Sequence, residues 1–252
     1  MSELLTKTEN GVLQITLNRP EKRNALNDAL ISGLKNAFVS ARDNAEIHAV
    51  LIRGAGNDFC SGADLSALQK IAQSSITENL EDAESLAELF LLIREFPRPV
   101  VAAVHGNALA GGCGLATACD LVLASDDALF GYPEVKIGFV PAIVMAILRR
   151  NISEKRSFEL ITKGFSFTAQ EALEMGLINR VFPASEFESA ALDYVSDFGK
   201  TSLSAVELSK KLLYQMDGLS FESSMKAGSE INAIARMTED CQRGIARFLD
   251  KK

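Results

Sequence analysis

The strongest constraint on the fold is a glycine-rich run at residues 104–120, VHGNALAGGCGLATACD. It directly follows an apolar segment at residues 100–104, VVAAV, which is typical of a parallel strand covered on both faces. Gly111, Gly112 and Gly114 fall where a helix would begin, and a helix start leaves backbone N–H groups without intrahelical partners. The run therefore favours an α/β fold in which these N–H groups bind a negatively charged or polarised oxygen. Close helix–strand packing, which tolerates only small residues, would produce the same pattern.

Two common nucleotide-binding loops do not fit this run. A phosphate loop of the Walker type ends in Gly-Lys-Ser/Thr, and no such triplet follows the glycines. As a dinucleotide fingerprint the run would end at Thr117, and the next apolar strand, at residues 121–124, begins almost at once. That spacing leaves no room for the long crossover helix of a dinucleotide-binding unit.

A second candidate for free backbone donors lies at residues 57–65, NDFCSGADL. The segment follows a strand, turns at Ser61 and Gly62, and is expected to enter a helix at Asp64. A helix start at this point would leave the N–H of Ala63 free to bind an oxyanion. An ordinary strand-to-helix turn has the same features, so the residues alone leave both interpretations open.

The candidate acid/base is Glu134, in the run FGYPEVKIGFVP at residues 130–141. Its neighbours are apolar or small, and a carboxylate in such surroundings has a raised pKa that suits proton exchange near neutral pH. A surface carboxylate at a turn is the commoner fate of glutamate.

Periodicity predicts short strands alternating with helices up to Pro141 and mainly helices afterwards. Strands are expected at residues 12–17, 49–52, 100–104, 121–124 and 180–182. Helices are expected at residues 27–42, 78–96, 142–150, 153–163, 168–175, 185–199, 201–216 and 238–250, with Asn27 as an N-cap and Thr168 and Glu171 in a capping box. This spacing indicates a coiled α/β core followed by a helical C-terminal layer.

Composition excludes several other classes of protein. The chain has 252 residues and a formal net charge of −7, so nothing indicates binding to nucleic acid or to an anionic membrane. No apolar stretch approaches the ~20 residues of a membrane span, and the N-terminal residues do not resemble a signal peptide. The four cysteines form no CxxC pair, which argues against a cysteine metal site and fits reduced thiols in the cytoplasm. Two histidines are too few for a three-histidine zinc site.

Taken together, these segments resemble the crotonase family, the enoyl-CoA hydratase/isomerase superfamily. The resemblance covers nearly the whole chain in the right order. It is carried by RPEKRNALN (19–27), FCSGADL (59–65), VHGNALAGGCGLATACDLVLAS (104–125), FGYPEVKIGFVP (130–141), TAQEALEMGLINRVFP (168–183) and RGIARFLDKK (243–252).

The resemblance implies an α/β fold, a spiral of ββα turns with a C-terminal helical trimerisation region. It places a core with the CoA-thioester site at residues 1–195 and a helical oligomerisation region at residues 196–252. It also implies a homotrimer or homohexamer and an acyl-CoA thioester as substrate. No metal or separate cofactor is implied, because CoA enters as part of the substrate. The family's oxyanion hole would fall on the N–H groups of Ala63 and Gly111.

Members of the family that hydrate double bonds typically use two glutamates. The second is kept here as Glu134, whereas the first position is occupied by Gly114, which has no side chain. The resemblance therefore implies an enzyme with a single glutamate acid/base, hydration being favoured. Two alternatives stay open: a 3-enoyl to 2-enoyl CoA isomerase, and a CoA-binding assembly protein without catalysis.

The resemblance also implies contacts with the CoA part of the substrate. The backbone of Ala63, Asp64 and Leu65 would meet the adenine, and Lys22 and Arg23 would lie near the phosphates. Phe248 and Lys251 match C-terminal positions that reach the CoA of the same or a neighbouring subunit.

Overall fold

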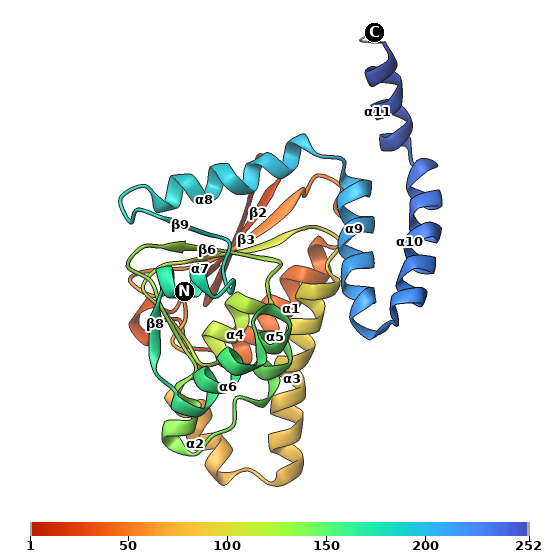
Figure 1. The fold of residues 1–252 in the computed structure, drawn as a ribbon. Coiled ribbons are helices and arrows are strands. Elements are labelled where there is room, and N and C mark those ends of the chain that lie inside the picture. The colour runs from red at the N-terminus through yellow and green to blue at the C-terminus, as the bar shows by residue number, and fades with distance from the viewer. Residues whose placement is uncertain (1, 251–252) are drawn as a thin grey trace.

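The computed structural model describes residues 2–250, which form a large sheet, a small sheet and a set of surrounding helices (Figure 1). The large sheet has the strand order β1-β2-β3-β4-β6-β9. Its strands are β1 (Leu4–Glu9), β2 (Val12–Leu17), β3 (Ala49–Gly54), β4 (Val100–Val104), β6 (Leu121–Ser125) and β9 (Arg180–Phe182). Only the β1–β2 pair is antiparallel, and β2 to β9 are parallel neighbours. The predicted α/β class is confirmed.

A second sheet of three short strands has the order β5-β7-β8. These strands are β5 (Asn107–Leu109), β7 (Leu129–Gly131) and β8 (Ser166–Thr168). The chain passes from β4 in the large sheet to β5 in the small one and then into helix α4 (Gly111–Ala118). It repeats this course from β6 to β7 and then to the 3-10 turn η2 (Pro133–Ile137). Each passage places a helix or turn start at the end of the small sheet.

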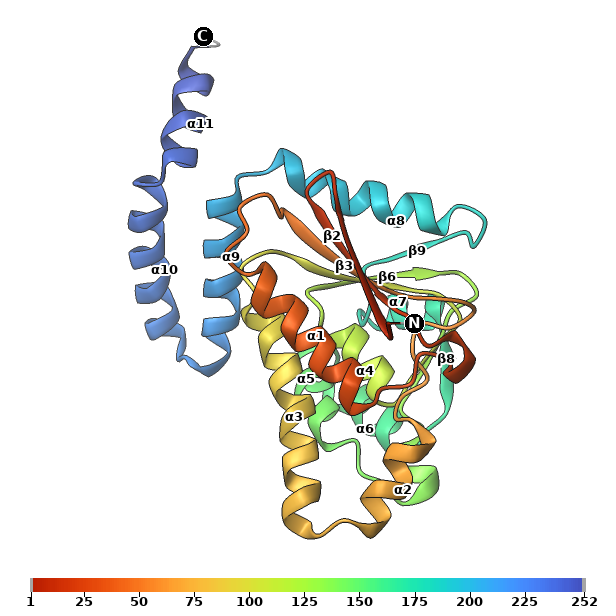
Figure 2. The same cartoon turned by 180° about the vertical axis from the view of Figure 1, so that it is seen from behind.

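Both faces of the large sheet are buried, as the apolar run at residues 100–104 predicts. Val100, Ala102 and Val104 point into the larger core, whereas Val101 and Ala103 point into the smaller one. The larger core is closed by helices that include α1 (Asp28–Ala41), α3 (Ile76–Glu95) and α4. The smaller core is closed by α8 (Phe187–Ser196), which lies across the sheet in Figures 1 and 2. This double cover explains why the strand carries no polar side chain.

Two predicted helix caps are present in the structure. The Asn27 side chain accepts a hydrogen bond from the Leu30 N–H at 2.8 Å, and Thr168 and Glu171 form the predicted capping box. The remaining helices of the core region are α2 (Leu65–Gln73), α5 (Ala142–Asn151), α6 (Glu154–Lys163) and α7 (Ala169–Glu174).

The C-terminal region consists of α9 (Leu203–Gln215), α10 (Phe221–Arg236) and α11 (Glu239–Leu249). Helix α10 was not predicted from its sequence, FESSMKAGSEINAIAR, in which serine, glycine and charged residues are mixed with the apolar ones. None of its residues is fully buried. In Figures 1 and 2, α10 runs beside α9 and α11 extends away from the rest of the chain. Within residues 2–250, no helix combines the length and the apolarity that crossing a bilayer requires.

Helix α9 is attached to the core through the carboxylate of Asp120. The Asp120 Oδ2 atom accepts hydrogen bonds from Lys210 Nζ at 2.6 Å and from the Val100 N–H at 2.7 Å. Its Oδ1 atom accepts one from the Tyr214 hydroxyl at 2.5 Å. Burial lowers the pKa of Lys210, and the Asp120 charge opposes this shift. The ammonium is thus a buried charge that depends on its carboxylate partner.

We expect Asp120→Asn to lower the free energy of unfolding by about 3 kcal/mol, because the substitution leaves the Lys210 ammonium buried without its counter-charge. Urea denaturation at pH 7 measures this loss. The double variant Asp120→Asn/Lys210→Met should recover part of it, since both charges are then removed. A single variant as stable as the wild type would show that the pair does not hold α9.

Candidate active site

The two segments that were predicted to carry free donors lie against each other. The Cys60 N–H donates to Asn107 O at 3.0 Å, and the Leu109 N–H donates back to Cys60 O at 2.9 Å. Gly62 has φ +100°, and a Cβ built on it would lie 2.9 Å from the Ala110 Cβ. A side chain at position 62 would push the two segments apart, so glycine is required here for both its conformation and its size.

The N–H groups of Ala63 and Gly111 have no acceptor among the described residues. Gly111 is the first residue of α4, where an N–H has no intrahelical partner and the helix dipole is positive. It follows Ala110, whose φ of 49° and ψ of −125° form a strained conformation for a residue with a Cβ. The hydrogen bond from the Ala110 N–H to Gly131 O, 2.8 Å long, holds this conformation. The arrangement offers two adjacent donors to one oxygen atom.

The Ala63 donor is positioned by the loop that follows β2. The Leu26 N–H donates to Gly62 O at 2.7 Å, and the Asp64 N–H donates to Leu26 O at 3.0 Å. The Ser61 N–H donates to Arg23 O at 3.0 Å. The backbone on both sides of Ala63 is therefore paired, whereas the Ala63 N–H has no acceptor among residues 2–250.

The buried ion pair between Arg19 and Asp64 also holds the loop that contains Ala63. Arg19 donates from Nη2 to Asp64 Oδ2 at 2.5 Å and from Nη1 to Ala25 O at 2.5 Å. The other carboxylate oxygen of Asp64 accepts hydrogen bonds from the Ser66 N–H and Ser66 hydroxyl, both at 3.0 Å, and caps α2. The Ser66 N–H, followed by the Arg19 guanidinium, lowers the pKa of Asp64 from 3.8 to about 2. Nothing in the residue types of the sequence identified Arg19, because its partner lies 45 residues away.

Glu134 lies in the 3-10 turn η2, directly after Pro133, and its side chain is partly buried. Its Oε2 atom is buried and has no hydrogen-bond partner among the described residues. Burial raises the pKa of Glu134, as its apolar sequence context predicted. The turn that carries Glu134 follows β7, whose Gly131 O accepts the Ala110 N–H at 2.8 Å directly before the first residue of α4. This hydrogen bond joins the segment of the acid/base candidate to the start of α4.

Gly114 faces a closed apolar wall. A Cβ built on it would overlap with Val144 Cγ1 of α5 and would lie 3.3 Å from Phe90 Cζ of α3. Val144 is 3% exposed and Phe90 is 5% exposed, so neither side chain has an open space to move into. Position 114, where the resemblance expects a first glutamate, therefore has no space for a longer side chain. The sequence analysis missed Val144 and Phe90, because this packing joins three separate helices.

The residues predicted to contact CoA lie in two different places. Lys22 and Arg23 are exposed beside the Ala63 loop and pair with no carboxylate among residues 2–250, and Leu65 is the first residue of α2. Phe248 lies on α11, on the extended C-terminal region and far from α2 in Figures 1 and 2. Lys251 lies outside the described residues.

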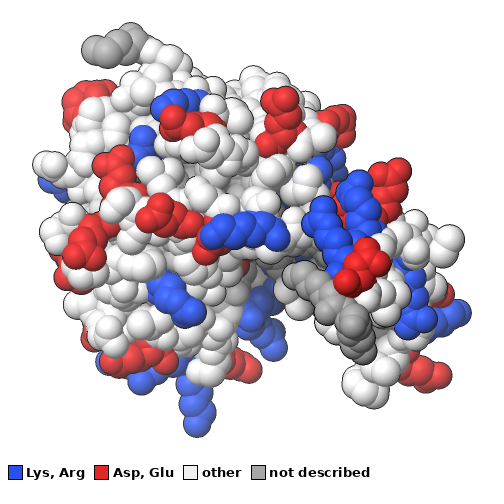
Figure 3. Space-filling view, turned by 90° about the horizontal axis from the view of Figure 1, so that it is seen from above, with Lys and Arg blue, Asp and Glu red and all other residues white. Residues whose placement is uncertain are grey.

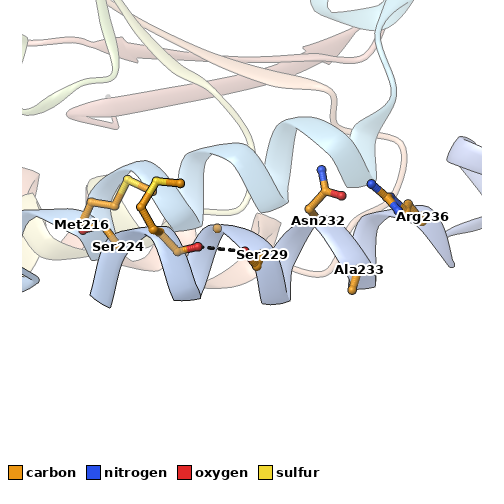
Figure 4. A pocket seen from close by; sticks show the side chains of 8 residues that line it. Met216, Ser224, Ser229, Asn232, Ala233 and Arg236 are labelled. Atoms are coloured by element: carbon orange, nitrogen blue, oxygen red, sulfur yellow. Dashed lines mark hydrogen bonds between the residues drawn. The ribbon is translucent and has the colours of Figure 1, made fainter. Parts of the chain in front are cut away.

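The remaining surface has a different character. A shallow hollow of about 480 Å³ between α9 and α10 is lined by residues that include Met216, Met225, Ala233 and Arg236, and none of the predicted site residues (Figure 4). On the face seen in Figure 3, acidic and basic side chains are interspersed. The hollow is thus separate from the candidate active site.

We expect the lowered pKa of Asp64 to appear in the acid denaturation of the protein. Because its folded-state pKa is about 2 and its ordinary value is 3.8, Asp64 contributes stability that is complete above about pH 4 and is lost as the pH falls towards 2. Asp64→Asn should be less stable at pH 7 and should lose less stability over that window, as measured by urea denaturation at each pH. Asp28→Asn, at an exposed carboxylate, is the control that retains the wild-type slope.

The comparisons with known proteins agree with this geometry. The model of the enoyl-CoA hydratase/isomerase family matches residues 7–252. The chain is 34% identical over 253 residues to a 2,3-dehydroadipyl-CoA hydratase of Escherichia coli, covering 100% of this chain and 97% of the relative.

Among solved structures, an enoyl-CoA hydratase of Mycobacterium smegmatis matches with a TM-score of 0.95 and 31% identity, covering 100% of this chain and 98% of that one. Human enoyl-CoA hydratase domain-containing protein 3 matches with a TM-score of 0.94 and 28% identity, over 99% and 98% of the two chains. The predicted crotonase fold is thereby confirmed. The chain belongs to the enoyl-CoA hydratase/isomerase family.

Proposed function

We propose that this chain acts on an unsaturated acyl-CoA thioester, with the N–H groups of Ala63 and Gly111 as the oxyanion hole and Glu134 as the single acid/base. The observation that carries this proposal is the unpartnered, buried Oε2 of Glu134, on a turn whose preceding strand is hydrogen-bonded to Ala110 at the start of α4. The substrate supplies the CoA group, so we propose no separate cofactor. Three buried free cysteines suit a reducing compartment such as the cytoplasm.

In the hydration reaction, Glu134 takes a proton from a water molecule whose oxygen attacks the β carbon of the 2-enoyl group. The electron pair of the double bond moves to the thioester, and its oxygen becomes an enolate between the two N–H donors. Glu134 then returns the proton to the α carbon, which gives a 3-hydroxyacyl-CoA. Each oxyanion donor contributes about 3 kcal/mol to lowering such a barrier.

A second candidate is the isomerisation of a 3-enoyl to a 2-enoyl thioester, and the closed wall beside Gly114 favours it. Here Glu134 takes the proton from the α carbon, the enolate forms in the same oxyanion hole, and the proton returns to the γ carbon. No water is consumed and one base is enough. Both candidates use the same three groups of the protein. They differ in the source of the proton, in the carbon that receives it, and in whether a hydroxyl group is added to the β carbon.

The CoA part would be held at the edge of the same site. Lys22 and Arg23 are exposed cations without a carboxylate partner among residues 2–250, which suits contact with phosphates. The backbone of Ala63, Asp64 and Leu65 would meet the adenine. Phe248 would reach the CoA of the same or a neighbouring subunit, and the extension of α11 away from its own core favours the neighbouring one. Lys251, which lies outside the described residues, is expected to join it.

We expect Glu134→Gln to lower turnover by about 10²–10⁴-fold, the usual effect of removing a positioned acid/base. Its thermal stability at pH 7 should not fall, because the substitution replaces a half-buried carboxylate whose charged form is disfavoured. The assay offers 2-enoyl, 3-enoyl and glutaconyl-type thioesters and identifies each product by mass.

Glu46→Gln makes the same chemical change at an exposed position and should keep full activity. Hydroxyacyl product from the wild type identifies hydration, and 2-enoyl product from a 3-enoyl substrate identifies isomerisation. Full activity of Glu134→Gln contradicts both mechanisms. CoA binding without any turnover by the wild type identifies an assembly protein.

We also propose that residues 196–252 assemble the chain into a homotrimer or homohexamer. The large apolar side chains of Phe221, Met237 and Phe248 are 84%, 80% and 67% exposed, which a second copy of the chain would cover. We expect Phe221→Asp/Met237→Asp to lower the mass measured by light scattering to that of a monomer, because the charges oppose burial in an interface. An unchanged mass, with unchanged helix content by circular dichroism, would contradict this assignment.

A further inference from the structure

The space beside Gly114 lies one helical turn below the donor of the oxyanion hole. Gly111 and Gly114 are three residues apart on α4, so they lie on the same side of the helix. A thioester whose oxygen accepts the Gly111 N–H would therefore place its reacting carbons near the level of Gly114. Whatever fills the space beside Gly114 can decide which groups reach those carbons.

That space is filled by Val144 and closed by Phe90. A Cβ at position 114 would overlap with Val144 Cγ1, and the Phe90 ring follows at 3.3 Å. Neither side chain can donate or accept a proton, and neither can orient a water molecule. The wall thus contributes no group to proton transfer, which leaves this task to Glu134.

Two ion pairs with one carboxylate, that of Asp217, join the helices that carry Phe90 and Val144. Arg94, one turn after Phe90 on α3, pairs with Asp217, and Arg150 of α5 donates from Nε to the same carboxylate oxygen at 2.9 Å. Asp217 follows the end of α9, so this residue links the helices that carry Phe90 and Val144. These partly exposed ion pairs therefore join the two helices that flank position 114.

We propose that Val144 is a specificity-determining residue. It fills the space of a side chain at position 114 and so keeps a second carboxylate and its water out of the site. This exclusion shifts the reaction from hydration towards double-bond migration. This inference rests on the proposed function, because it concerns the choice between its two reactions. In migration the proton leaves the α carbon and returns to the γ carbon through Glu134. In hydration a water molecule must also be held and deprotonated beside the β carbon. Val144 disfavours hydration, because its side chain occupies the volume in which a second carboxylate and this water would lie.

The steric part is tested by the stability of Gly114→Ala, Val144→Ala and their combination. Gly→Ala inside a helix ordinarily stabilises, but here the added methyl group meets Val144, so we expect the midpoint of thermal unfolding to fall by about 4–8 °C. Val144→Ala removes the atom that this methyl group would meet. The double variant should therefore be more stable than the sum of the two single effects predicts. Additive effects would overturn the steric pairing, and this readout needs no substrate.

The chemical part is tested by the products of Gly114→Glu/Val144→Gly beside those of the wild type and Gly114→Glu. With 2-enoyl and 3-enoyl thioesters supplied together, we expect the ratio of hydroxyacyl to isomerised product to rise by about 10²-fold in the double variant, the lower end of what one positioned base provides. Gly114→Glu alone should unfold at a lower temperature without this change in ratio.

The outcomes separate this inference from the proposed function. An unchanged ratio in a folded double variant, or an equal rise in Gly114→Glu alone, would overturn the role of Val144 while Glu134→Gln still abolished turnover. The role of Val144 would also be overturned if Gly114→Glu/Val144→Gly does not fold and the stability effects of Gly114→Ala and Val144→Ala are additive. If the wild type has no turnover, the proposed function is refuted, and so is the preference for double-bond migration over hydration. The alanine variants then still test whether a side chain at position 114 meets Val144.

Discussion

The buried ion pair between Arg19 and Asp64 is the interaction on which the rest of the site depends. Two charges removed from water cost stability unless further hydrogen bonds satisfy the atoms that remain. Here the guanidinium also donates to Ala25 O and contacts the Glu3 carboxylate, and the second oxygen of Asp64 caps helix α2. The pair thus joins the loop after β2 to the start of α2, with Ala63 held between them. Its geometry determines where the first oxyanion donor points.

Two features of the candidate site act oppositely on negative charge: the start of α4 favours it, and the burial of Glu134 disfavours it. At α4, the start of a helix leaves an N–H unpaired, and a positive helix end favours the negative charge of an enolate. At η2, burial disfavours the negative charge of Glu134 and raises its pKa, so the carboxyl group binds and releases a proton more readily near neutral pH. In the proposed reaction, the enolate is therefore stabilised next to the acid that returns its proton. Neither effect requires a metal ion.

Much of this could be predicted from the sequence, because the signals were local. The apolar run at residues 100–104 indicated a doubly covered strand, Asn27 and Thr168 marked helix starts, and the context of Glu134 indicated a raised pKa. Helix α10 was missed although Ser220 caps its start, because its apolar residues are interrupted by serine, glycine and charged residues and none of them is fully buried within residues 2–250. The roles of Arg19 and Val144 depend on partners 45 and 30 residues away, and no local pattern encodes such pairs.

The absence of the first family glutamate is a property of the packing around position 114 and not of this residue alone. Gly114 belongs to α4, whereas the atoms that close its space belong to α3 and α5, and Asp217 ties these two helices together after the end of α9. A glutamate placed at position 114 would therefore have to displace Val144. Close-packed interiors accommodate such a change poorly, because the strain spreads to every neighbour of the displaced group. The proposed single-carboxylate site thus agrees with the packing of α3, α4 and α5, and a carboxylate at position 114 would require the side chains of these helices to change together.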